Sequence, residues 1–261
     1  MGRWEKAEKG FAWMEDSTAF PTFGPASWGP LASAFEAFHG GDVDAALTIY
    51  TDGGEPESMP VSLFFRSPEQ FREVDRIALT LVRGRVLDVG AGVGSVTLAL
   101  QEAGVDVTAL EVIPEAVAVM TGRGVRAVLQ GSVLDLPPDP TFDTLLLLMN
   151  GLALAGTQAG IGPLLQALEG FLAPGGQVLL DSTDLTAGDG AEPGELHYQI
   201  EFQGRKGAPF PQLFLDSAAL RRMAGSEGWI AEKVWEGEDG EYLARLSRAP
   251  TRKGVNRRHS P

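Results

Sequence analysis

From residue 70 onward, short apolar runs alternate with segments whose apolar residues recur at helical spacing. The segment before Gly84, for example, places Phe71, Val74, Ile77 and Leu81 on one face of a helix. Later apolar runs are likewise separated from amphipathic stretches by glycine or proline. The pattern predicts helices over 71–81, 95–103, 114–121, 161–172 and 217–228, and strands over 85–90, 106–112, 126–131, 142–149, 177–181, 230–236 and 241–247.

This alternation determines the expected fold class. Strands that alternate with helices of about ten residues need crossover connections, which are right-handed and give a parallel sheet covered on both faces. The last two strands are joined by the tight turn Gly237–Gly240 and are therefore antiparallel neighbours. We expect an α/β protein with a doubly wound, mostly parallel sheet whose last strand is antiparallel.

Two regions interrupt the alternation. Residues 1–30 show no sustained periodicity and are interpreted as an irregular or loosely helical arm. Apolar runs at 47–50 and 61–65 flank a Gly/Pro-rich stretch, which predicts a hairpin. A second, inserted hairpin is predicted from the runs at 197–203 and 212–215.

The composition narrows the possible functions. The 261 residues include 35 acidic and 21 basic side chains, a net charge of -14, so a polyanion such as nucleic acid meets a repulsive average field. The absence of cysteine excludes disulfides, cysteine-ligated zinc, iron–sulfur clusters and thiol catalysis. The sequence shows no export signal or membrane-spanning run. We therefore expect a cytoplasmic protein with no membrane partner and no metal site, and nucleic acid is a disfavoured partner that only a local basic patch could bind.

The segment with the clearest chemistry is Val86–Ser95, in which a predicted strand leads into a glycine-rich turn and then a helix. Glycines allow the chain to turn sharply and let a ligand approach the backbone. The helix N-terminus behind them offers free N–H groups. Glu111 ends the next predicted strand, where a carboxylate can accept both hydrogen bonds of a ribose diol. Together these features indicate a ligand that contains adenosine.

The spacing of the glycines distinguishes between classes of adenosine ligand. Dinucleotide binders use G-x-G-x-x-G, because the pyrophosphate lies on the helix N-terminus. Here the spacing is G-x-G-x-G, and Ser95 occupies the position of the third glycine. Asp88 precedes the turn, where a carboxylate disfavours a pyrophosphate but favours an ammonium or sulfonium group.

At these residues the chain resembles the class I S-adenosylmethionine-dependent methyltransferases. Val86–Ser95 is similar to their first motif and Leu110–Val112 to their second. Residues 142–149 resemble their fourth strand, and residues 171–181 resemble the segment that leads through their fifth strand. The resemblance spans about residues 70–248. It implies a Rossmann-like sheet of seven strands and S-adenosyl-L-methionine as the cofactor.

The resemblance also implies which residues hold the cofactor. Asp88 is expected to orient the ammonium group, Glu111 to hold the ribose and Val112 to pack on the adenine. Ser132 is expected to hydrogen-bond the adenine amino group, although the family usually has an acid at this position. The expected cofactor-binding residues are Asp88, Gly90, Ala91, Gly92, Gly94, Glu111, Val112, Ser132, Val133 and Asn150.

Three residues are candidates for catalysis, and each has a structural alternative. Asn150 follows the predicted central strand at the edge where α/β sheets bind ligands, or it forms only an Asn-Gly turn. Asp181 lies at the same edge, or it only caps a turn. His197 is a candidate general base or a surface residue. Arg66 is a candidate for binding the cofactor carboxylate, or an ordinary surface arginine.

The sequence thus predicts an enzyme that transfers a methyl group to a small-molecule acceptor. Methylation of nucleic-acid bases is disfavoured, because Met149–Gly151 lacks the Asn/Asp-Pro-Pro tetrapeptide that similar enzymes use on DNA bases. The alternatives are an NAD(P)-dependent oxidoreductase and a non-catalytic S-adenosylmethionine-binding protein.

The predicted domain organisation has three parts. Residues 1–69 are expected to form an N-terminal arm and a cap over the active site. Residues 70–249 are expected to form the methyltransferase domain, with an inserted lid hairpin at 186–215. Residues 250–261 are expected to be a disordered basic tail.

Overall fold

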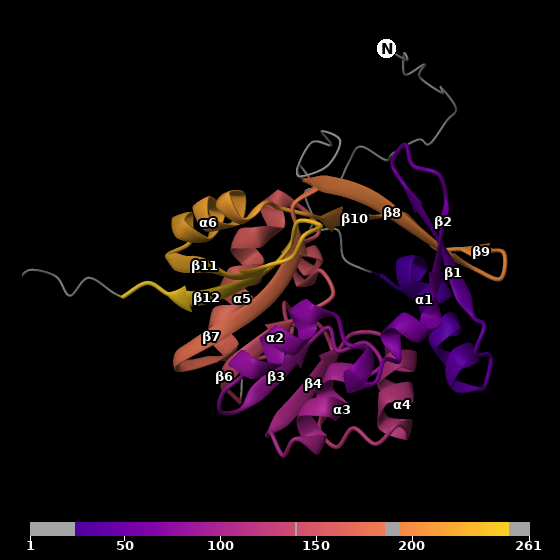
Figure 1. Cartoon of the computed structure of the whole chain (residues 1–261), viewed down its shortest axis with the longest axis horizontal. Helices are drawn as coiled ribbons and strands as arrows, with labels where there is room; N and C mark the ends of the chain where they lie inside the picture. The colour runs from indigo at the N-terminus through magenta and orange to yellow at the C-terminus, as the bar shows by residue number, and fades with distance from the viewer. Residues whose placement is uncertain (1–23, 139, 186–193, 251–261) are drawn as a thin grey trace, which may run out of the picture.

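The computed structural model describes residues 24–138, 140–185 and 194–250 (Figure 1). The predicted tail beyond residue 250 and most of the predicted N-terminal arm lie outside these ranges. The helices are α1 (Pro25–His39), α2 (Glu73–Leu81), α3 (Ser95–Glu102), α4 (Pro114–Gly122), α5 (Ile161–Phe171) and α6 (Ser217–Ser226). Four short 3-10 helices are η1 (Val61–Phe64), η2 (Pro68–Gln70), η3 (Gly151–Ala155) and η4 (Gln158–Gly160).

The main sheet has seven strands in the order β11-β12-β7-β6-β3-β4-β5. Its strands are β3 (Val86–Val89), β4 (Val107–Glu111), β5 (Val128–Gln130), β6 (Phe142–Leu147), β7 (Leu172–Thr183), β11 (Trp229–Glu236) and β12 (Glu241–Arg248). The pairs from β7 to β5 are parallel, whereas β12 runs antiparallel to both of its neighbours. The expected fold class is therefore confirmed, including the antiparallel last strand.

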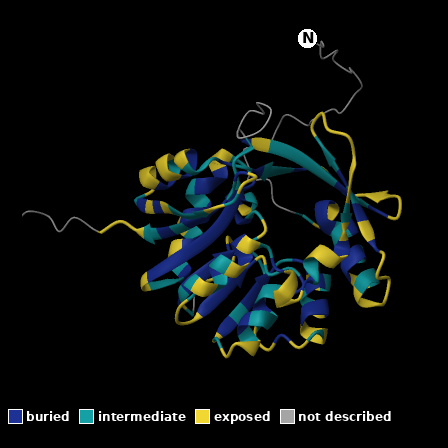
Figure 2. Ribbon diagram, viewed as in Figure 1, coloured by how far each residue is buried: buried dark blue, intermediate teal, exposed yellow. Residues whose placement is uncertain are grey.

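Helices cover both faces of this sheet (Figure 2). Successive residues along each strand point their side chains to opposite faces. Leu145 and Leu147 of β6 pack with α5 and α6 in the largest hydrophobic cluster. Leu146, between them, faces the other side and packs with Leu100 of α3. The sheet is consequently buried on both faces, which explains why its strands read as continuous apolar runs.

The second sheet is antiparallel and joins segments that are far apart in the chain. It contains β1 (Ala46–Thr51), β2 (Glu57–Pro60), β8 (Glu195–Phe202) and β10 (Phe210–Leu213) in the order β10-β8-β1-β2, and β9 (Arg205–Lys206) pairs with β8. Helix α1 packs between this sheet and α4 through Trp28, Phe35 and Val119 (Figure 1). The inserted segment thus shares one sheet with the N-terminal region.

The structure corrects three predicted boundaries. The second strand of the first hairpin is β2, not residues 61–65, because Pro60 has no N–H for the ladder and Val61 begins a 3-10 helix. Helix α1 begins at Pro25, inside the stretch interpreted as an irregular or loosely helical arm, rather than at Leu31, where a short helix over 31–38 is predicted; Pro occupies its first position. Strand β7 begins at Leu172, which pairs with Phe142 before the register shifts.

None of the helices in the described ranges is long and apolar enough to cross a bilayer.

Candidate functional site

A large cavity of about 920 Å³ lies at the carboxyl ends of β3, β4 and β6. Its floor consists of the residues that directly follow these strands, such as Gly90, Val112 and Leu148. Its other walls come from α1 and from β10, through Phe35 and Gln212. Parallel α/β sheets bind ligands at this edge, and the volume is near the upper end of the roughly 300–1,000 Å³ typical of ligand pockets.

The glycine turn between β3 and α3 contributes two glycines to the cavity. Gly90 and Gly92 line it and have positive φ angles of 72° and 56°. A Cβ on Gly92 would meet no atom within 4 Å, and one on Gly90 would meet only Leu154 at 3.8 Å. The space above these residues is therefore open to a ligand.

Gly94 has a different environment from the other two glycines. It does not appear among the cavity-lining residues, and a Cβ added to it would lie 2.8 Å from Val125 and 3.1 Å from Met120. Gly94 therefore permits the start of α3 to pack closely against α4 and the segment between α4 and β5. The structure places it behind the turn, in contrast to its predicted contact with the cofactor.

Glu111 at the end of β4 braces the glycine turn. Its carboxylate accepts hydrogen bonds from the backbone N–H groups of Gly92 at 2.7 Å, Val112 at 2.8 Å and Ile113 at 2.9 Å. Burial raises the pKa of Glu111, although these three bonds oppose the shift. Glu111 lines the cavity as predicted. The sequence did not predict its bonds to the turn.

Asp88 is buried at the end of β3 and also lines the cavity. The hydroxyl of Thr97 in α3 donates to its carboxylate at 2.6 Å. Burial raises the pKa of Asp88 to about 6, with a further contribution from the nearby negative charge of Glu111. An incoming cationic group would restore the charged form of this carboxyl.

The remaining predicted cofactor contacts lie around the same cavity. Ala91, Val112, Ser132 and Val133 all line it. The oxygen of the Ser132 side chain accepts a hydrogen bond from the N–H of Leu134 at 3.1 Å. Two loops, after β4 and after β5, therefore bring the predicted adenine-binding residues to one wall.

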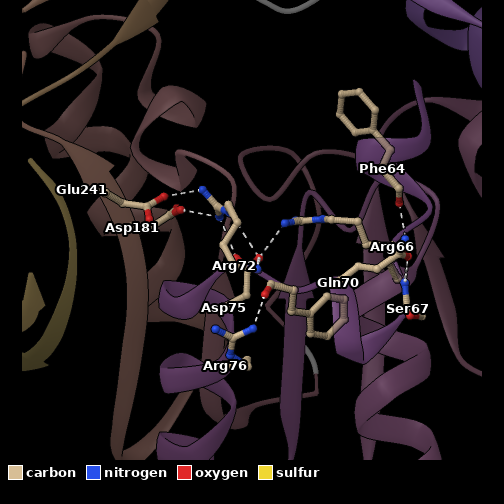
Figure 3. A network of polar contacts seen from close by, with 11 residues as sticks. Phe64, Arg66, Ser67, Gln70, Arg72, Asp75, Arg76, Asp181 and Glu241 are labelled. Carbon is tan, nitrogen blue, oxygen red and sulfur yellow. Dashed lines mark hydrogen bonds and ion pairs between the residues drawn. The ribbon is translucent and has the colours of Figure 1, made fainter. Parts of the chain in front are cut away.

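Arg66 reaches the cavity from the segment after η1 and is 8% exposed (Figure 3). Its guanidinium group is 2.9 Å from Asp75 of α2 and lies over the ring of Phe71. Its Nε atom is buried and has no hydrogen-bond partner within the described ranges. Arg66 is thus a buried cation with an unused donor, unlike an ordinary surface arginine.

Asn150 and Asp181 lie side by side at the sheet edge, and both are bonded within the protein. Asn150 lines the cavity; its Nδ2 donates to the carbonyl of Leu213 at 3.3 Å and its Oδ1 accepts from Ser182 at 3.2 Å. Asp181 is 2.8 Å from Arg72 and accepts the N–H of Gly151 at 3.0 Å. The Asp181 carboxylate is therefore occupied by contacts within the protein, and Asp181 does not line the cavity.

His197 lies apart from this cavity. It is in β8, is 41% exposed and pairs through Nδ1 with Asp52 at 2.9 Å. It is absent from the cavity lining, so the geometry gives no support to its predicted role as a general base. Within the described part of the chain, no cluster of three or more His, Asp or Glu residues is arranged to hold a metal ion.

Comparisons with known proteins identify the family. A family model for a methyltransferase domain matches residues 86–176. Cypemycin N-terminal methyltransferase from a Streptomyces species is 37% identical over 103 residues, which cover 38% of this chain and only 42% of that relative's length.

The solved structures extend the likeness to almost the whole fold. A SAM-dependent methyltransferase from Bacteroides fragilis, in complex with S-adenosyl-L-homocysteine, is 34% identical, with a TM-score of 0.80 over 86% of this chain and 97% of its own. The CcbJ methyltransferase from Streptomyces caelestis shares the fold at 16% identity, with a TM-score of 0.57 over 71% of this chain and 92% of its own. The chain therefore belongs to the S-adenosylmethionine-dependent methyltransferases, with S-adenosyl-L-methionine as its cofactor.

Proposed function

We propose that this protein transfers the methyl group of S-adenosylmethionine to a small, largely apolar acceptor bound in the same cavity. The observation that carries the acceptor class is a set of exposed apolar side chains in the cavity lining. Leu134, Met149 and Leu154 line the cavity yet are 42%, 41% and 41% exposed. Exposed apolar side chains that gather around one concave site favour an apolar ligand.

The residues around the turn fit the cofactor. The open space above Gly90 and Gly92 suits close approach of its methionine part, and Asp88 suits the ammonium group. Glu111 is in place for the ribose, because carboxylates at this strand end accept the hydrogen bonds of a diol. When bound, S-adenosylmethionine supplies a methyl group activated by the sulfonium charge.

The remaining space supports an acceptor beside the cofactor. The cap of α1 and the second sheet contributes Leu31, Phe35 and Gln212 to the cavity, and α5 contributes Gln166. We infer that the cap excludes water from the reacting atoms, as lids do in many enzymes. In-line transfer depends strongly on position, and the amides of Asn150, Gln166 and Gln212 can orient an acceptor without exchanging a proton.

The test is a survey of acceptors by release of S-adenosylhomocysteine. We would compare apolar amines and phenols with their charged or polar analogues, and include short peptides, since the cypemycin relative is named for an N-terminal reaction, as well as RNA and DNA oligonucleotides. Turnover with apolar small molecules is the expected result. Turnover only with nucleic acid would contradict the proposed acceptor class, and cofactor binding without any turnover would favour a binding protein.

Asp88 should make cofactor affinity depend on pH. In the free protein its pKa is about 6, above the ordinary value of 3.8, so this group destabilises the fold as the pH rises from about 4 to 6. The cofactor ammonium favours the charged carboxylate. Affinity should therefore fall as the pH drops below about 6, approaching tenfold per pH unit. Calorimetry across this range should show this pH dependence of the affinity in the native protein and not in Asp88→Asn. A pH dependence that persists in the variant would show that another group causes it.

Arg66 should recognise the cofactor carboxylate. We expect Arg66→Met to weaken S-adenosylmethionine binding by about 1.5–3 kcal/mol, the usual range for a hydrogen bond to a charged group. Binding of 5′-methylthioadenosine, which lacks the amino-acid portion, should be unchanged. Equal losses for both ligands, measured by calorimetry, would show that Arg66 shapes the cavity rather than binding the carboxylate. Asp75 keeps Arg72 as a partner in the variant, so no buried charge is left unpaired.

A further inference from the structure

Two consecutive residues at the cavity have unusual backbone conformations. Met149 and Asn150 have φ angles of 64° and 61°, a region that costs a residue with a side chain about 1–3 kcal/mol. Both line the cavity and follow β6, the neighbour of β3, after one intervening residue. They therefore stand beside the glycine turn at the edge where the acceptor would meet the cofactor. A strained turn at this place persists only if its surroundings hold it.

The end of β7 supplies that support. Asp181, which is 1% exposed, accepts the N–H of Gly151 at 3.0 Å. The next residue, Ser182, donates its hydroxyl to the side-chain oxygen of Asn150 at 3.2 Å. A side chain on Gly151 would lie 2.4 Å from Leu147, so the turn has little room to move toward β6. The turn is thus held from β7.

Asp181 is itself fixed by an arginine at the start of α2. Arg72 binds Asp181 at 2.8 Å, Asp75 at 2.6 Å and Glu241 of β12 at 2.5 Å (Figure 3). Asp75 also binds Arg66, which lines the cavity. Through Asp75, Arg72 and Asp181, these contacts connect Arg66 at the cavity to the Met149–Gly151 turn.

The charges of this network show that Asp181 is not needed to neutralise it. The network contains two arginines, Arg66 and Arg72, and three carboxylates, Asp75, Asp181 and Glu241. Removal of any one carboxylate leaves two positive and two negative groups. Asp181 differs from Glu241 in that it also bonds to the turn.

We propose that Asp181, oriented by Arg72, is a positioning residue for methyl transfer, because it fixes the Met149–Gly151 turn against the glycine turn. The proposal rests on the proposed methyl transfer but not on the apolar character of the acceptor. The step it supports is one in which the methyl carbon leaves the sulfonium sulfur and bonds to the acceptor lone pair, with sulfur keeping the electron pair. Such a step is sensitive to displacements of about 1 Å, which can cost 100-fold in rate.

The test compares Asp181→Ala with the matched control Glu241→Ala. Each variant removes one carboxylate from Arg72 and leaves equal numbers of positive and negative groups in the network. Asp181→Ala should lower the melting temperature more than Glu241→Ala, because Asp181 is the more buried of the two and its loss also leaves the Gly151 N–H without an acceptor. Asp181→Ala should lower kcat about 10- to 100-fold with the best acceptor of the survey, while the affinity for S-adenosylmethionine stays within about twofold of the native value. Glu241→Ala should retain kcat. If Asp181→Ala does not fold, Asp181→Leu, which has a similar size and no hydrogen-bond acceptor for the Gly151 N–H, replaces it with the same expectations.

Amide exchange gives a second readout that needs no acceptor. By NMR, the Gly151 N–H should lose protection in Asp181→Ala and keep it in Glu241→Ala. Equal kcat in the two variants would overturn the proposal, as would unchanged protection of Gly151. If no acceptor in the survey reacts, the proposed acceptor class fails, while the exchange measurement still decides whether Asp181 holds the turn.

Discussion

Replacing Gly92 with valine should abolish cofactor binding while the protein stays folded. Gly92 lines the cavity with φ at 56°, and the direction in which a side chain would project is free of protein atoms. A valine there would occupy the space in which the ligand approaches the backbone. We expect at least about a 100-fold loss of S-adenosylmethionine affinity by calorimetry, or about 2.8 kcal/mol.

Gly104, just after α3, provides the matched control for backbone strain. Its φ is 79° and a Cβ there also meets no atom within 4 Å, but it does not line the cavity. The left-handed conformation should destabilise Gly104→Val by about 1–2 kcal/mol, as it does Gly92→Val. Gly104→Val should nevertheless bind the cofactor with native affinity. Native affinity in Gly92→Val would show that the ligand does not approach the turn. Equal loss of affinity in both variants would assign the effect to stability.

The main sheet could be predicted because the residue pattern that specifies each of its strands lies within one short stretch of the sequence. Each strand is a short apolar run, most of them bounded by glycine or proline, and the crossovers between them then imply a parallel sheet. The second sheet was only partly predictable. Strand β1 pairs with β8, so that Ile49 lies opposite Ile200, and no local pattern shows a pairing across 150 residues. The sequence therefore indicated two hairpins but not that they share a sheet.

The same distinction applies to the site. Asp88, Gly90 and Glu111 were predicted to bind the cofactor from their places at strand ends, and the parallel register brings all three to the cavity. Gly94 fits the same sequence motif, but only tertiary packing shows that Val125 lies against it.

The charge network behind the site was missed for a similar reason. Arg72 and Asp75 are three residues apart and could have been paired from the sequence. The contact of Arg72 with Asp181 spans 109 residues and leaves no local signal. The role of Asp181 as a support for the turn could therefore be seen only in the folded structure.

Replacing Glu111 with alanine should weaken both the fold and cofactor binding. The variant leaves the N–H groups of Gly92, Val112 and Ile113 without their shared acceptor. A buried donor without a partner costs about 1–3 kcal/mol, so the free energy of unfolding, measured in urea, should fall by at least that amount. Loss of the ribose contact should also weaken cofactor binding, by about 1–3 kcal/mol.

Two ligands separate the contact with the ribose from the brace on the turn. S-adenosylmethionine and 5′-methylthioadenosine share the ribose, so Glu111→Ala should weaken both by similar factors, whereas Arg66→Met should affect only the first. Reduced stability with unchanged affinity for both ligands would show that Glu111 supports the glycine turn but does not bind the ribose. A loss confined to S-adenosylmethionine would instead place its effect at the methionine end, through Gly92. Because the same carboxylate braces the turn and faces the cavity, we expect bound cofactor to stabilise the native protein more than the variant.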